Sequence, residues 1–169
     1  MRKKAIVVLV IGMLVLIAFD LFSFRLISER EIDDVSPGIY CEDEYITKSD
    51  ILWVIPFFEN KSIAENRTWC NYILSLNKTA GMHGVYHTYE EFDVENNGEY
   101  IDIGIKEFEK CFGFKPEMFK PHQLAFDNAN HEILEKSKLE YKGQLNQLLH
   151  KVYHCSDTGI FKNWFVDLF

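Results

Sequence analysis

The first 24 residues constrain this chain most, because they are apolar over a length that matches a lipid bilayer. A basic start, Met1-Arg2-Lys3-Lys4, precedes an apolar run from Ala5 to Phe19, and a second apolar stretch after Asp20 ends at Phe24. About 20 apolar residues in a helix span the hydrocarbon core. The pattern predicts a signal anchor or transmembrane segment over residues 1–24, followed by one globular domain over residues 25–169.

The orientation of this segment follows from its flanks. Basic residues beside an apolar helix stay in the cytoplasm, which places the rest of the chain outside the cell, on a single-pass membrane protein. No Ala-x-Ala-like site follows Phe19, so we expect the segment to remain uncleaved. Glycosylation acceptor triplets begin at Asn60, Asn66 and Asn77 and support an exterior location, although such triplets also arise by chance in polar stretches.

Charge and cysteine content limit the partners further. The formal net charge is −8, and the 18 basic residues are scattered rather than gathered on a stripe, which argues against nucleic acid as a partner. Outside the cytoplasm, Cys41, Cys70, Cys111 and Cys155 permit two disulfides in any of three pairings; four reduced thiols are the alternative. The sequence has no Cys-x-x-Cys pair, so a structural zinc site built from cysteines is not expected.

Short apolar runs alternate with amphipathic segments, which is typical of an α/β domain. A buried strand is predicted from Ile51 to about Ile55, before Pro56. The Ser62-x-x-Glu65 pattern is typical of a capping box and predicts a helix start there. Further apolar periodicity predicts the remaining elements, namely helices over 63–76, 101–112, 128–138 and 161–168 and a strand over 148–153.

Two polar motifs are candidates for chemistry. Consecutive side chains on a strand point to opposite faces, so Asp33 and Asp34 can share one site only where the strand stops, and Pro37-Gly38 predicts such a stop. The alternative interpretation of this pair is an acidic turn in solvent.

His83 and His87 form the second motif. In an extended strand they would lie about 13 Å apart, too far for one ion. Gly84 permits a bend after His83, and Thr88-x-x-Glu91 predicts a helix that starts just beyond His87. Bent backbone would bring the two imidazoles together, although surface helices also carry this spacing by accident.

The order of these motifs resembles that of the polysaccharide deacetylase superfamily. An apolar run leads to Asp-Asp and a turn, and later His-Gly-x-x-His leads into Thr-Tyr-x-Glu-Phe; the match extends from Asp33 to Pro121. The chain looks like a divergent, shortened branch. The resemblance implies a shortened, distorted (β/α) barrel of parallel strands, preceded here by the transmembrane helix, with the site at the carboxyl ends of the strands.

The resemblance also implies roles for individual residues. In that family the second aspartate of the first motif and the two histidines bind a divalent metal, usually zinc, and these match Asp34, His83 and His87. The first aspartate is the general base, which implies Asp33. A later histidine is the general acid, and His154 is the best match, because it closes an apolar run and turn residues follow it.

Other matched positions depart from the family pattern. Lys120 and His122 stand in the region of an Arg-x-Pro-aromatic motif and are predicted to lie at the substrate, but an ammonium lacks the planar fork with which arginine grips a carboxylate. The acidic-tryptophan motif that precedes the last histidine in the family is not recognisable. His150 is a rival to His154, and His131 is predicted to be a surface residue.

These observations favour a metal-dependent hydrolase that removes N-acetyl or O-acetyl groups from a cell-surface or extracellular glycan. Its partner would be an acetylated amino-sugar polysaccharide or oligosaccharide, and its cofactor one divalent ion, most simply Zn²⁺. The alternative is a catalytically inactive, membrane-tethered glycan-binding relative. An unrelated membrane-anchored structural protein is a third hypothesis. Retention of both Asp33 and Asp34 favours an enzyme, since a module that only binds has no need of the base, whereas the shortened chain favours the relative.

Overall fold

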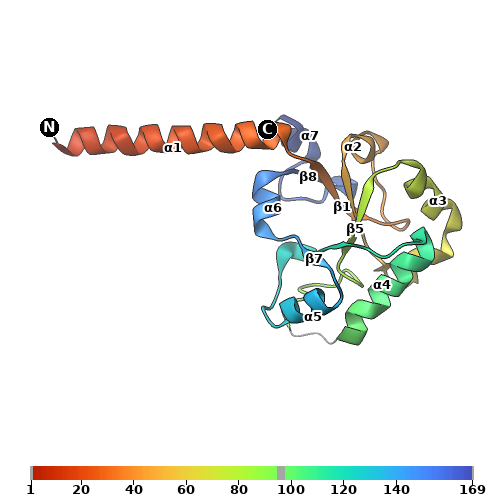
Figure 1. The fold of residues 1–169 in the computed structure, drawn as a ribbon. Helices are drawn as coiled ribbons and strands as arrows, with labels where there is room; N and C mark the ends of the chain where they lie inside the picture. Colours follow the sequence, from red (N-terminus) through yellow and green to blue (C-terminus); the bar gives the residue numbers. More distant parts are fainter. Residues whose placement is uncertain (1, 95–97, 169) are drawn as a thin grey trace.

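Helix α1 (Arg2–Ile27) projects from one side of an α/β domain in the computed structural model, which describes residues 2–94 and 98–168 (Figure 1). Met1 and Phe169, the outer ends of the two predicted segments, lie outside the described residues. Apolar side chains are exposed on all sides of α1, and the stretch Lys3–Ile27 is long and apolar enough to cross a membrane. The predicted apolar helix over residues 1–24 therefore extends three residues further, to Ile27.

Six parallel strands form the sheet of the domain, in the order β7-β6-β5-β2-β1-β8. Their bounds are β1 (Arg30–Val35), β2 (Ile51–Val54), β5 (Thr79–His83), β6 (Met118–Lys120), β7 (Glu140–Tyr141) and β8 (Lys151–His154). A separate antiparallel pair, β3 (Phe57–Phe58) and β4 (Lys61–Ser62), follows β2. Because all six strands run the same way, their carboxyl ends meet at one edge of the sheet, where ligand sites of α/β proteins usually lie.

The strand order is that of a (β/α) barrel with one gap. Neighbouring strands follow one another in chain order from β1 to β7, and β8 returns to pair with β1 in parallel. Within the described residues, β7 and β8 are not paired with each other. The predicted α/β domain of parallel strands is therefore confirmed, whereas the predicted barrel is not closed among the described residues. β7 is only two residues long, and helix α6 (Gln144–Leu149) occupies the connection between the two strands.

The remaining helices are α2 (Asp43–Lys48), α3 (Arg67–Ser75), α4 (Gly98–Phe112), α5 (Asn130–Lys136) and α7 (Asn163–Leu168). The predicted helix over 63–76 begins later than expected, because Ser62 caps only a 3-10 turn over Ile63–Glu65. The α-helix starts after Asn66, whose side-chain oxygen accepts a hydrogen bond from the amide of Trp69 at 3.0 Å. Similarly, the predicted strand over 148–153 is helical at its start and becomes β8 only at Lys151.

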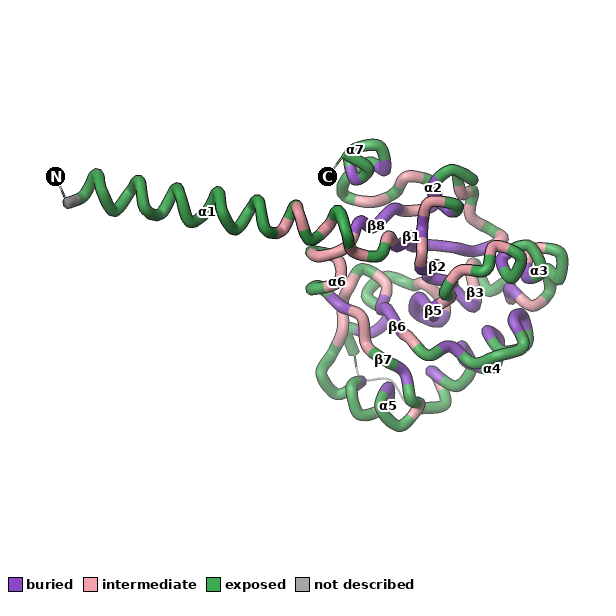
Figure 2. The backbone as a smooth tube through the Cα atoms, turned by 45° about the horizontal axis from the view of Figure 1, so that its top comes forward, coloured by how far each residue is buried: buried purple, intermediate pink, exposed green. Residues whose placement is uncertain are grey.

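Buried strand residues and the inner faces of α3 and α4 form the core, which Figure 2 shows as the purple centre of the domain. Of the three possible pairings, the structure has Cys70–Cys111, which joins α3 to α4, and Cys41–Cys155, which joins the segment after β1 to the end of β8. Two disulfides in so small a domain are typical of proteins outside the cytoplasm.

Candidate functional site

The two aspartates at the end of β1 face the same cleft because the strand is irregular between them. The register of β1 against β2 shifts between Ile32 and Val35, and Asp34 has a φ of 65°. An extra residue of this kind turns the next side chain relative to the pleat. The strand stops after Val35 and a turn follows at Pro37-Gly38, as predicted. The irregularity at Asp34 was not predicted; aspartate tolerates left-handed backbone better than most residues do.

The two histidines converge because the chain turns sharply between them. His83 is the last residue of β5, and both Gly84 and His87 have positive φ, at 61° and 56°. The predicted helix beyond His87 is wrong: the residues from Tyr89 to Val94 form turns and bends. Instead the Glu91 carboxylate accepts hydrogen bonds from the turn.

Glu91 holds this turn from inside. Its carboxylate accepts hydrogen bonds from the amides of Val85, at 3.1 Å, and Tyr86, at 2.6 Å. A side chain at Gly84 would collide with it, since a Cβ there would lie 2.3 Å from Glu91 Oε2. The sequence pattern at Glu91 therefore indicated capping correctly, but the amides that it caps precede it.

Four side chains meet at the carboxyl edge of the sheet. His87 Nε2 lies 2.8 Å from Asp34 Oδ1, and His83 Nε2 lies 3.4 Å from the same oxygen. His122, which follows β6, joins them, and one ligand atom from each of the four residues lies within 4.8 Å of the others. An ion with bonds of 2.0–2.1 Å keeps tetrahedral ligands about 3.4 Å apart, so imidazole and carboxylate groups at these distances fit a zinc-like ion.

Outer contacts orient this cluster. His83 Nδ1 donates to the backbone carbonyl of Lys120 at 3.0 Å, which leaves Nε2 facing Asp34. The hydroxyl of Thr158 lies 3.1 Å from Asp34 Oδ2, the oxygen that the histidines do not contact. Such second contacts fix the tautomer and the direction of metal ligands. Thr158 carries no sequence motif and was not predicted.

The charges in the cluster are balanced by pairing. Burial alone would raise the pKa of Asp34, but hydrogen bonds and attraction from His83 and His87 outweigh it and lower that pKa. Burial would likewise lower the pKa of His83, yet Asp34 raises it. Burial, with repulsion from His87 and His83, lowers the pKa of His122 to about 4. His122 is therefore a neutral imidazole at neutral pH, the form that binds metals.

Asp33 lies beside the cluster, held by a buried cation. Lys120 Nζ is 2.8 Å from Asp33 Oδ1 and 3.2 Å from Glu31 Oε2, and all three side chains are buried. Lys120 does not line the cleft, so its predicted contact with substrate is not what the structure shows. The side chain instead orients Asp33, in spite of lacking the fork of arginine.

Glu31, the second carboxylate beside Lys120, was not predicted from the sequence. Trp53 Nε1 donates to its Oε2 at 2.7 Å, and His150 Nδ1 lies 2.5 Å from its Oε1. The available signal was its place in β1, two residues before Asp33 and therefore on the same face of the strand. His150 is engaged with Glu31 and does not line the cleft, so it is not placed to replace His154.

The ionised state of Glu31 should stabilise the domain in a defined pH window. Burial opposes ionisation, but the hydrogen bond from His150, the charge of Lys120 and the hydrogen bond from Trp53 lower the pKa from 4.5 to about 2. A lowered pKa means that this stability is present above pH 4.5 and lost as the pH falls toward 2. The full loss corresponds to about 3 kcal/mol.

Urea unfolding of the wild type and of Glu31→Gln across this range tests the expectation. The glutamine variant should be less stable near neutral pH, since Lys120 loses a partner, and the difference in unfolding free energy should narrow in acid. A difference in unfolding free energy that stays constant as the pH falls would contradict the assigned role of ionised Glu31.

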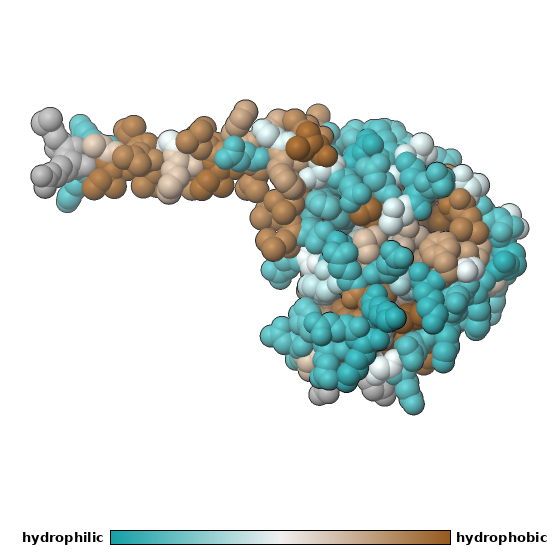
Figure 3. All heavy atoms as spheres, viewed as in Figure 1, coloured by the Kyte–Doolittle hydropathy of each residue, from teal (hydrophilic) through white to brown (hydrophobic). Residues whose placement is uncertain are grey.

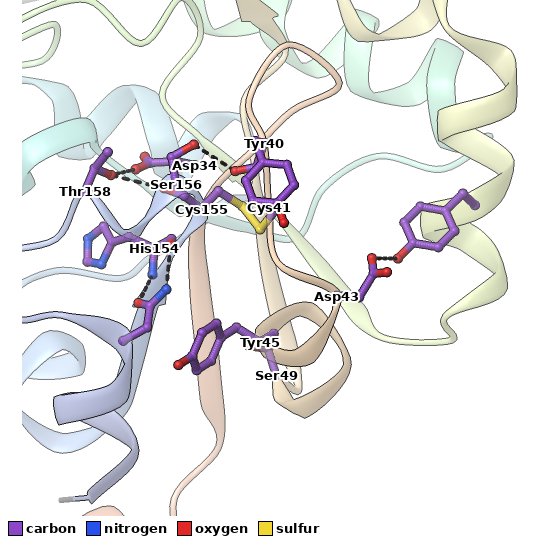
Figure 4. Close-up of a disulfide and its surroundings, with 12 residues drawn as sticks. Asp34, Tyr40, Cys41, Asp43, Tyr45, Ser49, His154, Cys155, Ser156 and Thr158 are labelled. Carbon is purple, nitrogen blue, oxygen red and sulfur yellow. Dashed lines mark hydrogen bonds between the residues drawn. A yellow bond between two sulfur atoms is a disulfide. The ribbon is translucent and has the colours of Figure 1, made fainter.

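His154, at the end of β8, completes the cleft. Its Nε2 lies 3.6 Å from Asp33 Oδ2, and its backbone is held by the side chain of Asn163, which accepts from its amide at 2.9 Å and donates to its carbonyl at 2.8 Å. Among the described residues its Nδ1 has no hydrogen-bond partner. Figure 4 shows His154 next to Asp34, Thr158 and the Cys41–Cys155 disulfide, which fixes the end of β8 against the segment after β1.

These residues open into a cleft of about 880 Å³. His122, which was predicted to lie at the substrate, lines the cleft but also belongs to the cluster of candidate metal ligands. Aromatic side chains line the cleft as well, namely Tyr40, Phe58 and Tyr89. A larger depression of about 1230 Å³ lies at the opposite edge of the sheet, near the first residues of β5 and β6, away from the histidines. The cleft at the carboxyl edge is therefore the candidate site.

No family model matches the chain, and no curated protein matches it. Similar solved structures include a CE4 family pseudoenzyme from Bacillus anthracis, at 14% identity and a TM-score of 0.44 over 54% of this chain and 31% of that one. A mutant form of a CE4 family pseudoenzyme gives the same identity and TM-score and is covered to 32%. A deacetylase with substrate has 15% identity and a TM-score of 0.44, over 62% of this chain and 53% of its own.

The chain thus spans about a third of the pseudoenzymes and about half of the deacetylase. Neither family membership nor function follows from similarity at this level, and the function has to be inferred from the side chains of the site.

Proposed function

We propose that this chain is a membrane-anchored, metal-dependent hydrolase that removes acetyl groups from the amino sugars of a glycan outside the cytoplasm. The observation that carries the proposal is the position of Asp33. Its carboxylate lies between the cluster of candidate metal ligands and His154, and it is held by a buried lysine that does not line the cleft. A protein that only bound metal or glycan would have no use for this arrangement.

The chemistry follows from these groups. A divalent ion held by Asp34, His83 and His87 would polarise a substrate carbonyl and would lower the pKa of a bound water to about 7. Asp33 then accepts the proton of the attacking water, and Lys120 keeps the carboxylate oriented for that transfer. A protonated His154 donates to the leaving nitrogen as the carbon–nitrogen bond breaks, which releases acetate and a free amine. For an O-acetyl group the same proton goes to the leaving oxygen.

His122 supports a second candidate function. Structural zinc sites are typically closed by four protein ligands, whereas catalytic sites keep one position open. The cluster of Asp34, His83, His87 and His122 supplies four ligand atoms, which is the number of a closed site. If His122 stays bound, the chain is a glycan-binding relative that keeps the metal without turnover.

Metal analysis and an acetate assay of the full-length protein in detergent test the proposal. We expect about one divalent ion per chain and acetate release from acetylated amino-sugar oligomers that a chelator abolishes and added Zn²⁺ restores. Metal binding without amide or ester hydrolysis would favour the binding relative. Absence of bound metal would overturn both functions.

The location is tested separately. A tag placed after Phe169 should be cleaved by protease added to intact spheroplasts, and the chain should stay with membranes after carbonate washing, because the basic end of α1 precedes the apolar run. Asn60, Asn66 and Asn77 are all exposed, so each is accessible to modification in a host that glycosylates. A tag protected until the membrane is permeabilised would reverse the topology, and a soluble mature form would show cleavage.

A further inference from the structure

The connection between α1 and the domain is too short to separate them. Only Ser28 and Glu29 lie between Ile27, where α1 ends, and Arg30, where β1 begins. The three steps from Ile27 to Arg30 span at most about 11 Å. In addition, Arg25 Nη1 donates to the backbone carbonyl of Leu148 in α6 at 2.9 Å. If α1 crosses a bilayer, the side of the domain around its end must therefore lie at the membrane surface.

That side of the domain carries exposed apolar side chains on both sides of the end of α1. In Figures 1 and 2, α6 and α7 flank the point where α1 meets the domain, and Figure 3 shows hydrophobic atoms continuing from α1 onto the domain there. We call this surface the α6–α7 face. Its exposed apolar side chains come from α6, from the segment before α7 and from α7 itself, namely Leu145, Leu148, Ile160, Phe161, Trp164 and Leu168.

The exposure of these side chains is unusual for a surface in water. Ile160 is 97% exposed, Leu145 71% and Trp164 62%. Contiguous apolar patches on soluble domains usually mark a contact surface. A cavity of about 530 Å³ between Arg25, Leu148 and Phe161 adds further apolar lining to the same face. Transfer of such surface from water is favourable by about 25 cal/mol per Å².

We propose that the α6–α7 face lies in the membrane interface, with its exposed apolar side chains at the headgroup ends of the lipid acyl chains. The inference rests on the proposed membrane anchoring by α1. The occupant is lipid because the stretch Lys3–Ile27, roughly 37 Å long at 1.5 Å per residue, is long enough to cross a hydrocarbon core of about 30 Å and ends at this face. Tryptophan and other aromatic side chains are enriched at that depth. His154 and Ile160 line both the apolar cavity and the catalytic cleft, so the cleft is held at the membrane surface.

Tryptophan fluorescence of the full chain in phosphatidylcholine vesicles tests the proposal, because the three tryptophans lie in different places. Trp164 is on the α6–α7 face, Trp53 is buried in the sheet and Trp69 is in α3, on the far side of the domain from α1 (Figures 1 and 2). Lipids brominated near the headgroup end of the chain quench only tryptophans that reach them. In the Trp69→Phe variant, we expect most of the emission of Trp164 to be quenched in brominated lipid, compared with the same variant in unbrominated lipid.

The matched variant Trp164→Phe keeps Trp53 and Trp69 and should show almost no quenching. Both changes conserve an aromatic ring, and Trp164 is exposed, so neither should prevent folding. Unquenched Trp164 in a chain that floats with the vesicles would overturn the contact while leaving the anchoring intact. A chain that does not float would overturn the anchoring on which the inference rests.

Discussion

Asp33→Asn is expected to keep its bound metal and to lose at least about a hundredfold in turnover, the lower end of what a general acid–base group contributes. Asp33 is not among the four clustered ligands, so its replacement leaves the donor set complete. The amide of asparagine cannot accept the proton of the attacking water. Acetate release and metal content of the same sample measure the two properties together.

His154→Ala is the matched change on the other side of the cleft and should lose rate to a similar extent with the metal retained. Because the two groups serve one reaction as a unit, their effects should not add, and the double variant should be little slower than either single variant. Full activity in a metal-loaded Asp33→Asn protein would show that the base is assigned wrongly. An inactive variant whose metal content has fallen as well would point to loss of the site, and its melting temperature would show whether the fold is lost with it.

Part of this site could be predicted because its residues act locally. His83-Gly84 ends a strand and turns within a few residues, so the convergence of His83 and His87 follows from short-range backbone geometry. The strand also stops before Pro37-Gly38 as predicted, but the irregularity inside β1 could not be predicted. Pro37-Gly38 is a strong turn signal, but the left-handed residue is Asp34, and aspartate in a strand gives no such signal by itself.

The contacts that orient the site could not be predicted from one sequence. Lys120 and Asp33 are 87 residues apart, and they meet only because β1 and β6 end at the same edge of the sheet. A lysine in a short strand is ordinarily exposed, and nothing local indicates that Lys120 is buried between two carboxylates. The same holds for Thr158, whose hydroxyl reaches Asp34 from a segment 124 residues away.

The second capping-box pattern fails for a related reason. Thr88-x-x-Glu91 has the composition of a helix start, but the next amphipathic run, in α4, begins only at Gly98. The Glu91 carboxylate then finds the unpaired amides of the preceding turn instead of those ahead of it. A short motif thus specified which group would be an acceptor, while the tertiary structure decided which amides it served.

Replacing the histidines of the cluster one at a time should show which of them bind the metal and which only lie beside it. We expect His83→Ala and His87→Ala each to lower metal affinity by more than about a hundredfold, because even residues that only orient ligands account for 10–100-fold. Both Nε2 atoms face the same oxygen of Asp34, at 3.4 and 2.8 Å, so either deletion removes a donor from the proposed set of Asp34, His83 and His87. Metal content after dialysis against a weak chelator measures the loss, and unchanged content in both variants would refute the site.

His122→Ala is the control that distinguishes an open site from a closed one. It makes the same chemical change within the same cluster, but if three protein ligands suffice, the variant should keep its metal with weaker affinity. Substitution with Co²⁺ then reports the coordination through its visible absorption. The spectrum should differ little between the wild type and the variant if water, and not His122, already fills the fourth position in the wild type. A loss of metal as large as that of His83→Ala would make His122 a full ligand, and, since four protein ligands leave no position for water in a tetrahedral site, the glycan-binding function would replace the hydrolase.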